Sequence, residues 1–176
     1  MARVDQSEVT IPLGVIVERR ASRSRWISET WRPVGVMLMG LTPVKPWTVL
    51  LADEGMTRYH AGVCDLVLHR KETEALRLNL MLEVPEIYVT LQEGSGEWPW
   101  EPAGVTASSF DAQDWEDPGD QIIERVAMPE AVAAFVQAFV EVHHVEETFK
   151  KRKRKEHVAE EKQFSKHPIF TPVLKQ

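Results

Sequence analysis

Apolar residues recur at every second position in several short runs over the first two thirds of the chain, which is the period of a β-strand. Turn-forming residues separate the runs, as at Asp53, Glu54 and Gly55. Gly62 interrupts the longest run and predicts a β-bulge. The runs predict strands over residues 11–17, 31–39, 47–51, 57–69, 87–91 and 121–126, and residues 105–110 are expected to pair into the same sheet.

Four segments between these runs lack a clear strand pattern. Residues 18–25 are charged and predict a loop, as do residues 93–102, which contain glycine and proline, and the acidic residues 111–120. Residues 71–83 are ambiguous, because their composition favours a helix while four alternate leucines favour a strand. We predict a strand for the second half of this segment.

The clearest helix begins at Pro129, because proline suits the first helical turn and Glu130 complements the positive end of the helix dipole. The helix is expected to run from residue 129 to 144 and to cap a sheet. The predicted fold class is therefore α+β: a mostly antiparallel twisted sheet or partly open β-barrel, capped by a C-terminal helix and followed by a flexible basic tail. The predicted buried stripe of the helix consists of Val132, Phe135, Val136, Phe139 and His143.

The 176 residues are enough for one domain with a core, and we expect a flexible N-terminus at 1–9, one globular domain at 10–145 and a charged tail at 146–176. The net charge of −6 is unevenly distributed: the tail has nine Lys/Arg and five Glu, which leaves 12 Lys/Arg and 22 Asp/Glu for the rest. No apolar run of roughly 18 residues and no secretory signal is recognisable, so the expected location is the cytoplasm. The basic run, a candidate anion-binding segment, is Lys150, Lys151, Arg152, Lys153, Arg154 and Lys155.

The residue types that carry chemistry are scattered. Cys64 is the only cysteine, which excludes an internal disulfide, and a regular strand would put it roughly 13 Å from His60, too far for a Cys–His pair. His143 and His144 are adjacent on the predicted helix and point about 100° apart, so they do not form a metal site. The acidic residues 111–120 lack the EF-hand spacing, and phosphate-binding glycine loops are absent. We therefore predict no catalytic residue, no metal ligand and no cofactor.

Two features remain as candidate contact surfaces. Trp98 and Trp100 flank a proline in a predicted loop, where they would either present large rings to a partner protein or pack locally against the domain. The basic run could bind nucleic-acid phosphates. No aromatic residue interleaves it and the domain before it is acidic, which favours a solvated or protein-binding tail.

Several segments of the chain, in order, are similar to a bacterial family classed as a domain of unknown function. The genes of this family commonly accompany those of molybdenum- or tungsten-dependent formate dehydrogenases. Members have sometimes been labelled molybdopterin-guanine dinucleotide biosynthesis protein A. The most specific part of the resemblance is the stretch from His69 to Thr73. The segments that carry it are Pro12 to Arg20, Tyr59 to Gly62, Leu68 to Glu74, Pro129 to His144 and Phe149 to Lys155.

The label suggests a guanylyltransferase, which would need a glycine-rich loop after the first strand to hold GTP. Here the first strand runs into Glu18, Arg19 and Arg20, with no glycine pair. The resemblance instead implies a non-catalytic accessory or adaptor protein for the assembly, maturation or regulation of such an oxidoreductase. Its implied partner is a protein, either an oxidoreductase subunit or a maturation factor.

Two alternatives belong to other functional classes. One is a small enzyme or carrier for a phosphorylated or pterin ligand, which would use His60, His69 or the pair Arg70 and Lys71. The other is nucleic-acid binding through the basic run. The predicted partner-binding surface comprises His69, Arg70, Lys71, Glu72, Thr73, Trp98 and Trp100.

Overall fold

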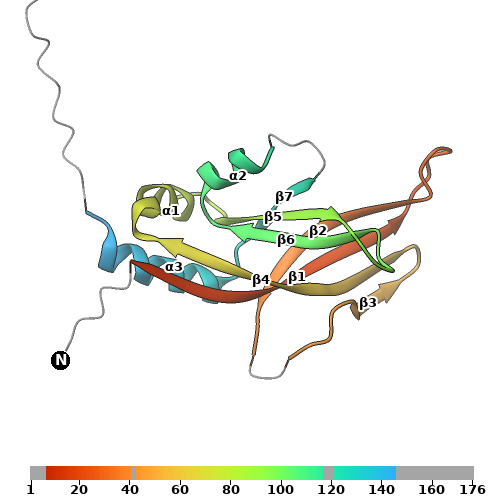
Figure 1. Ribbon diagram of the computed structural model, residues 1–176, viewed down its shortest axis with the longest axis horizontal. Helices are drawn as coiled ribbons and strands as arrows, with labels where there is room; N and C mark the ends of the chain where they lie inside the picture. Colours follow the sequence, from red (N-terminus) through yellow and green to blue (C-terminus); the bar gives the residue numbers. More distant parts are fainter. Residues whose placement is uncertain (1–6, 41–42, 117–120, 146–176) are drawn as a thin grey trace, which may run out of the picture. The chain divides into compact units, whose positions relative to one another are not determined.

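The computed structural model describes residues 7–40, 43–116 and 121–145, which form two antiparallel sheets and three α-helices (Figure 1). This confirms the predicted α+β class with a C-terminal helix; the described strands form two sheets and no closed barrel. The four-stranded sheet has the order β2 (Glu29–Leu38), β1 (Glu8–Ala21), β4 (Met56–His69), β3 (Thr48–Asp53). The three-stranded sheet has the order β6 (Trp100–Thr106), β5 (Glu86–Glu93), β7 (Ile122–Ala127). The helices are α1 (Thr73–Leu80), α2 (Ser109–Glu116) and α3 (Glu130–His143), and a 3₁₀ turn, η1 (Arg70–Glu72), precedes α1.

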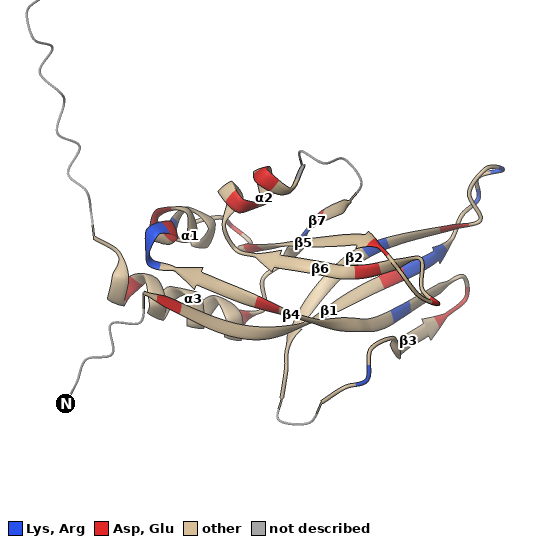
Figure 2. Ribbon diagram, in the orientation of Figure 1, with Lys and Arg blue, Asp and Glu red and all other residues tan. Residues whose placement is uncertain are grey.

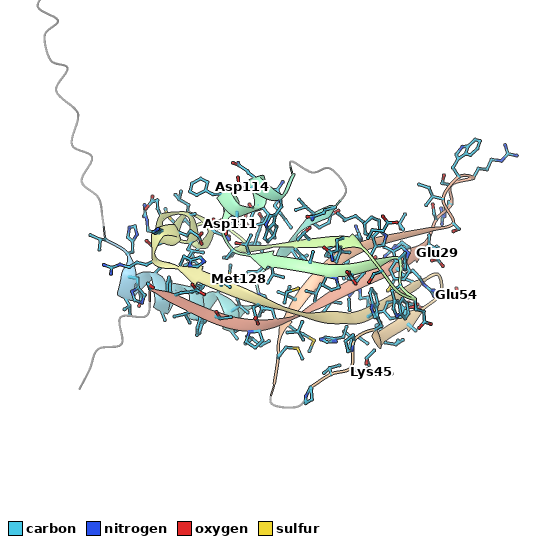
Figure 3. All side chains as sticks on the ribbon, in the orientation of Figure 1. Glu29, Lys45, Glu54, Asp111, Asp114 and Met128 are labelled. Carbon is cyan, nitrogen blue, oxygen red and sulfur yellow. The ribbon has the colours of Figure 1, made fainter. Side chains whose placement is uncertain are left out.

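The core lies between the two sheets. Strand β6 packs on β4 and β7 packs on β2, while α3 contacts α1. Met128, labelled in Figure 3, is buried between the layers. Side chains alternate between the two faces of β1, so every second one points into this core. The opposite face of the strand carries a glycine, an isoleucine and a glutamate. The fully buried residues of the facing strands are Leu13, Val15 and Val17 of β1 and Ile87, Val89 and Leu91 of β5.

Helix α3 forms where the apolar spacing predicted it, with two corrections to its buried stripe: His143 is only partly buried, and Phe135 is more exposed. Val132, Val136, Phe139 and Val140 are buried, whereas Phe135 is 39% exposed. The four buried residues follow the i, i+4, i+7, i+8 spacing of one helix face. Phe135 lies about 100° from Val136 around the helix and so falls at the edge of that face.

The predicted strand in the second half of residues 71–83 is wrong, because this segment contains helix α1. Leu76 is buried but Leu78 and Leu82 are 49% and 47% exposed, so the alternate leucines do not share a buried face. Asn79 holds the helix in place: its amide donates to the carbonyls of Glu86 at 2.8 Å and of Ala107 at 2.7 Å. These bonds tie α1 to the second sheet.

Two predicted loops contain regular structure. The acidic residues 111–120 were expected to be irregular, but Ser109–Glu116 is helix α2, whose Trp115 packs on Gly104. Strand β6 begins at Trp100 and includes Pro102, inside the predicted 93–102 loop. Proline is tolerated there because β6 is an edge strand with a register shift opposite Thr90 and Leu91.

Strand β1 extends beyond its predicted limits at both ends, from Glu8 to Ala21, so the first four residues of the predicted 18–25 loop are strand. The predicted bulge in β4 is present: Val15 pairs with Gly62 while Ile16 pairs with His60. None of the described helices is both long and apolar enough to cross a membrane. The predicted tail, residues 146–176, lies outside the described residues.

Candidate functional site

The β5–β6 connection approaches β3 and β4 (Figure 1). Four aromatic rings from these segments and from β2 meet there. Trp47 and Trp98 stack with ring centroids 4.5 Å apart and an interplanar angle of 12°. Tyr59 of β4 lies 5.2 Å from Trp98 and 5.9 Å from Trp47. Trp31 of β2 completes the set at 6.0–6.1 Å from each of the other rings. We call these four residues the aromatic cluster; its three tryptophans are only half-buried.

The backbone around the cluster is tightly constrained. The N–H of Gly94 donates to the carbonyl of Pro99 at 2.9 Å and closes the loop that carries Trp98. A side chain at position 94 would collide with the carbonyl oxygen of Trp98, so only glycine fits. Trp47 has a φ of +64°, a left-handed conformation that costs a bulky residue free energy. Its N–H donates to the carbonyl of His60 at 2.6 Å, which holds it there.

Arg19 borders the cluster. Its guanidinium carbon lies 5.9 Å from the ring centres of both Trp31 and Tyr59, a cation–π distance, and it pairs with Glu29 at 3.7 Å. The adjoining surface is hollowed by about 180 Å³ between Arg19, Glu29, Asp53 and other residues; Figure 3 labels Glu29 and Glu54 at this end. Small-molecule sites usually enclose roughly 300–1,000 Å³, so this hollow is small for a pterin or a nucleotide.

Strand β3 is the outermost strand of its sheet, and no described strand lies on its other side. All six of its residues are exposed, among them Val49 at 53%, Leu50 at 44% and Leu51 at 47%. Figure 2 shows no charge along β3 before its acidic end. Val49 pairs with Tyr59, which places the strand directly beside the aromatic cluster. Native proteins usually protect such an apolar edge with charge, proline or a covering element.

The aromatic cluster lies on one face of the four-stranded sheet. The other face holds a buried carboxylate, Glu18, whose side chain has no exposed surface. Arg58 donates to it at 3.0 Å, and Arg20 and Arg32 pair with it at 3.1 and 3.3 Å. Burial alone would raise the pKa of Glu18, but the hydrogen bond from Arg58 and the charges of Arg20 and Arg32 outweigh it and lower the pKa. All three arginines therefore stabilise the ionised form of the buried Glu18 carboxylate.

The predicted partner surface at residues 69–73 forms the junction between β4 and α1. His69 pairs with Glu8 at 3.5 Å. Thr73 is buried, its hydroxyl donates to the carbonyl of Arg70 at 3.2 Å, and it lies 3.3 Å from Nδ1 of His144. Lys71 is exposed. The role of residues 69–73 as a partner-binding surface stays a prediction.

Within this junction Glu72 is electrostatically unfavourable when ionised. Its Oε2 atom is buried and has no hydrogen-bond partner among the residues the structure describes. Burial and the negative charge of Asp111 raise the pKa of Glu72 above its ordinary value, although His69 acts in the other direction. The folded protein therefore binds a proton at Glu72 more tightly than the unfolded chain does.

Replacing Glu72 with Gln is expected to stabilise the protein by about 0.5 kcal/mol at pH 7–8, a modest gain because Glu72 is partly exposed and water screens the repulsion. A raised folded pKa means that wild-type Glu72 is most favourable below its unfolded pKa and loses this advantage as the pH rises. The gain should therefore vanish toward pH 4, as measured by thermal unfolding across pH. Glu74→Gln is the control: Arg77 lowers the pKa of Glu74, so a stabilising effect there would contradict the account.

The two halves of the predicted partner surface lie at opposite ends of β4. Tyr59 and His69 are separated by ten residues of strand, roughly 33 Å. Trp98 belongs to the aromatic cluster, and Trp100, at the start of β6, packs partly against the core. The basic run, Lys150 to Lys155, lies outside the described residues.

The residues considered for a phosphorylated or pterin ligand are not brought together. His60 is fully buried, and His69 lies nine residues further along β4, roughly 30 Å away. Arg70 and Lys71 follow His69 in η1. No shared site for these four side chains exists within residues 7–40, 43–116 and 121–145.

Sequence reasoning missed most of the aromatic cluster. Trp31, Trp47 and Tyr59 come from three separate strands or their flanks, and no local spacing connects them with Trp98. It also missed the burial of Glu18. The sequence contains one signal for this burial. If the strand is continued past Val17, alternation places Glu18 on the same face as Gly14 and Ile16.

These features define a small α+β protein of two antiparallel sheets with an exposed aromatic and apolar surface. No group of three or more His, Cys, Asp or Glu side chains that could hold a metal is found among the residues described. Residues 12–153 match the profile of a family described as "Protein of unknown function (DUF3305)", so the chain belongs to this family. This confirms the predicted membership of an uncharacterised family. Comparison with curated proteins and with solved structures found no match.

Proposed function

We propose that this protein is a non-catalytic adaptor that binds an extended segment of a partner polypeptide along β3, beside the aromatic cluster. The observation that carries the proposal is the exposed apolar run of β3 at an unpaired sheet edge. An extended peptide pairs its backbone with such an edge and gains specificity from pockets for its alternate side chains.

The neighbouring rings support this assignment. Tryptophan and tyrosine dominate the binding energy of many protein interfaces, because they bury large areas at low entropic cost. Val49 of β3 pairs with Tyr59, so side chains of an added strand on that face of the sheet would project next to the cluster. The left-handed Trp47, which joins the cluster to β3, is the kind of strained residue that occurs at functional sites.

The finer part of the proposal concerns the partner. The resemblance described for the sequence favours a subunit or maturation factor of a molybdenum- or tungsten-dependent formate dehydrogenase. The chemistry of the site is compatible with any partner that offers an extended apolar strand. The experiment must therefore identify the partner separately from testing the binding site.

Leu50→Lys tests the site, because a charge on an edge strand opposes the addition of a further strand. The full-length protein and the variant are purified from the native cells, and co-purifying proteins are quantified by mass spectrometry. Recovery of the partner is expected to fall at least ~10-fold, the effect of losing about 1.4 kcal/mol of binding free energy.

Leu78→Lys is the matched control, since Leu78 has a similar exposure (49%) but lies on α1. It should retain the partner. Loss through Leu78→Lys with retention through Leu50→Lys would contradict the β3 site and favour the surface around residues 69–73. Recovery of a β3-dependent partner unrelated to any oxidoreductase would remove the formate dehydrogenase part and leave the adaptor function.

A further inference from the structure

A buried histidine lies on the face of the four-stranded sheet that points away from the three-stranded sheet. His60 has no exposed surface, and neither of its ring nitrogens has a hydrogen-bond partner among the described residues. Burying polar nitrogens without partners is unfavourable, so such a group usually has an unrecorded partner or a functional reason. A neutral imidazole offers one nitrogen as an acceptor or metal ligand.

Gly14 identifies what surrounds this histidine. A Cβ atom at position 14 would come within 2.7 Å of Sδ of Met39 and 2.9 Å of Nε2 of His60. The thioether and the imidazole therefore face one point directly above the backbone of β1. Any side chain at position 14 would occupy that point, which explains the glycine.

A second methionine lies on the same face. Met37 is directly opposite Gly14 in the β1–β2 register, and residues directly opposite each other project from the same face of an antiparallel sheet. Met39 directly follows the end of β2, and the approach of its Sδ to position 14 places it on this face too. Both methionines are partly exposed, whereas His60 is fully buried.

We infer that Met37, Met39 and His60 form a site for a soft monovalent metal ion, copper(I). Thioether sulfur selects copper(I), and imidazole binds copper as well. All three donors bind a metal as neutral ligands, and the buried carboxylate on the same face of the sheet, Glu18, is engaged by three arginines. A divalent ion would carry twice the uncompensated charge into an apolar setting, which is far more costly than a single charge.

Cys64 does not belong to this site. It pairs opposite Leu13, whose side chain lies in the core, so its thiol projects from the other face of β4. Burial, with a smaller contribution from Asp65, raises the pKa of this thiol to about 11, so it is protonated near neutral pH. A thiol still competes for copper(I), and the test therefore uses the Cys64→Ala protein.

Full-length Cys64→Ala protein is titrated with copper(I) under anaerobic, reducing conditions against the chromophoric chelator bicinchoninate. The protein is expected to withhold one equivalent. Met39→Leu, which keeps the volume of the side chain, should weaken binding at least ~10-fold, a change of about 1.4 kcal/mol. Met81→Leu, at the exposed end of α1, is the control and should leave binding unchanged. Failure to withhold copper(I), or equal binding by the Met39→Leu and Met81→Leu proteins, would overturn the inference.

A second measurement separates a soft site from a general cation site. Silver(I), a redox-inert substitute for copper(I), should raise the melting temperature of the Cys64→Ala protein and not that of its Met39→Leu variant, because a ligand that binds the folded state stabilises it. Zinc(II) should have no comparable effect. Equal stabilisation by zinc(II), or silver(I) stabilisation that persists without Met39, would contradict the assignment.

Discussion

Phe139→Ala is expected to lower the free energy of unfolding by about 3–4 kcal/mol, because it leaves a cavity in the core under α3. Phe139 is 5% exposed and its ring lies 4.6 Å from that of His143. Phe135→Ala, on the same helix, should cost less than about 1 kcal/mol, since its ring is already partly in water. Urea denaturation of both variants measures the difference. Similar losses would show that α3 is rotated from the orientation described.

Glu18→Gln has the second large expected effect: it should lower the free energy of unfolding by about 2–3 kcal/mol at pH 7. Removing one member of a buried ion pair can cost more, but here the three arginines are half-exposed and keep water when Glu18 is neutralised. Glu29→Gln, which breaks an exposed pair with Arg19, is the matched control and should change stability by less than about 0.5 kcal/mol.

The pH dependence of this loss follows from the lowered pKa of Glu18. A folded pKa below the ordinary value of 4.5 means that ionised Glu18 stabilises the protein above about pH 4.5 and loses that contribution as the pH falls through the folded pKa. The gap between wild type and Glu18→Gln should therefore narrow in acid. A gap that stays constant from pH 7 to pH 3 would show that packing, rather than the ion pairs, makes Glu18 important.

The elements that could be predicted from the sequence are those with a local cause. Helix α3 has a proline at its start and four buried positions on one face, so neighbouring residues alone determine it. The strands β1, β4 and β5 are likewise predicted from neighbouring residues, because their apolar side chains alternate along the sequence. Helix α1 was mispredicted because leucines two apart fit both a strand face and a broad helix face. Asn79 decides between them through carbonyls 7 and 28 residues away.

The candidate sites depend on contacts that no local pattern contains. Glu18 was predicted to begin a loop because it is charged, yet its partners Arg32 and Arg58 are 14 and 40 residues further along the chain. Trp98 was predicted as a contact residue, whereas the rings that surround it come from β2, β4 and the residue before β3. Pairing between strands that are far apart in the sequence creates both groups, and no local pattern specifies which strands pair.

Hydrogen–deuterium exchange of the protein alone and in complex with its co-purified partner tests the adaptor proposal most directly. An added strand pairs with the free backbone groups of β3, so the amides of Thr48–Asp53 and of the loop at 94–99 should exchange more slowly in the complex. Exchange at residues 69–73 should be unchanged. Slower exchange at 69–73 together with unaltered exchange in β3 would contradict binding along the β3 edge.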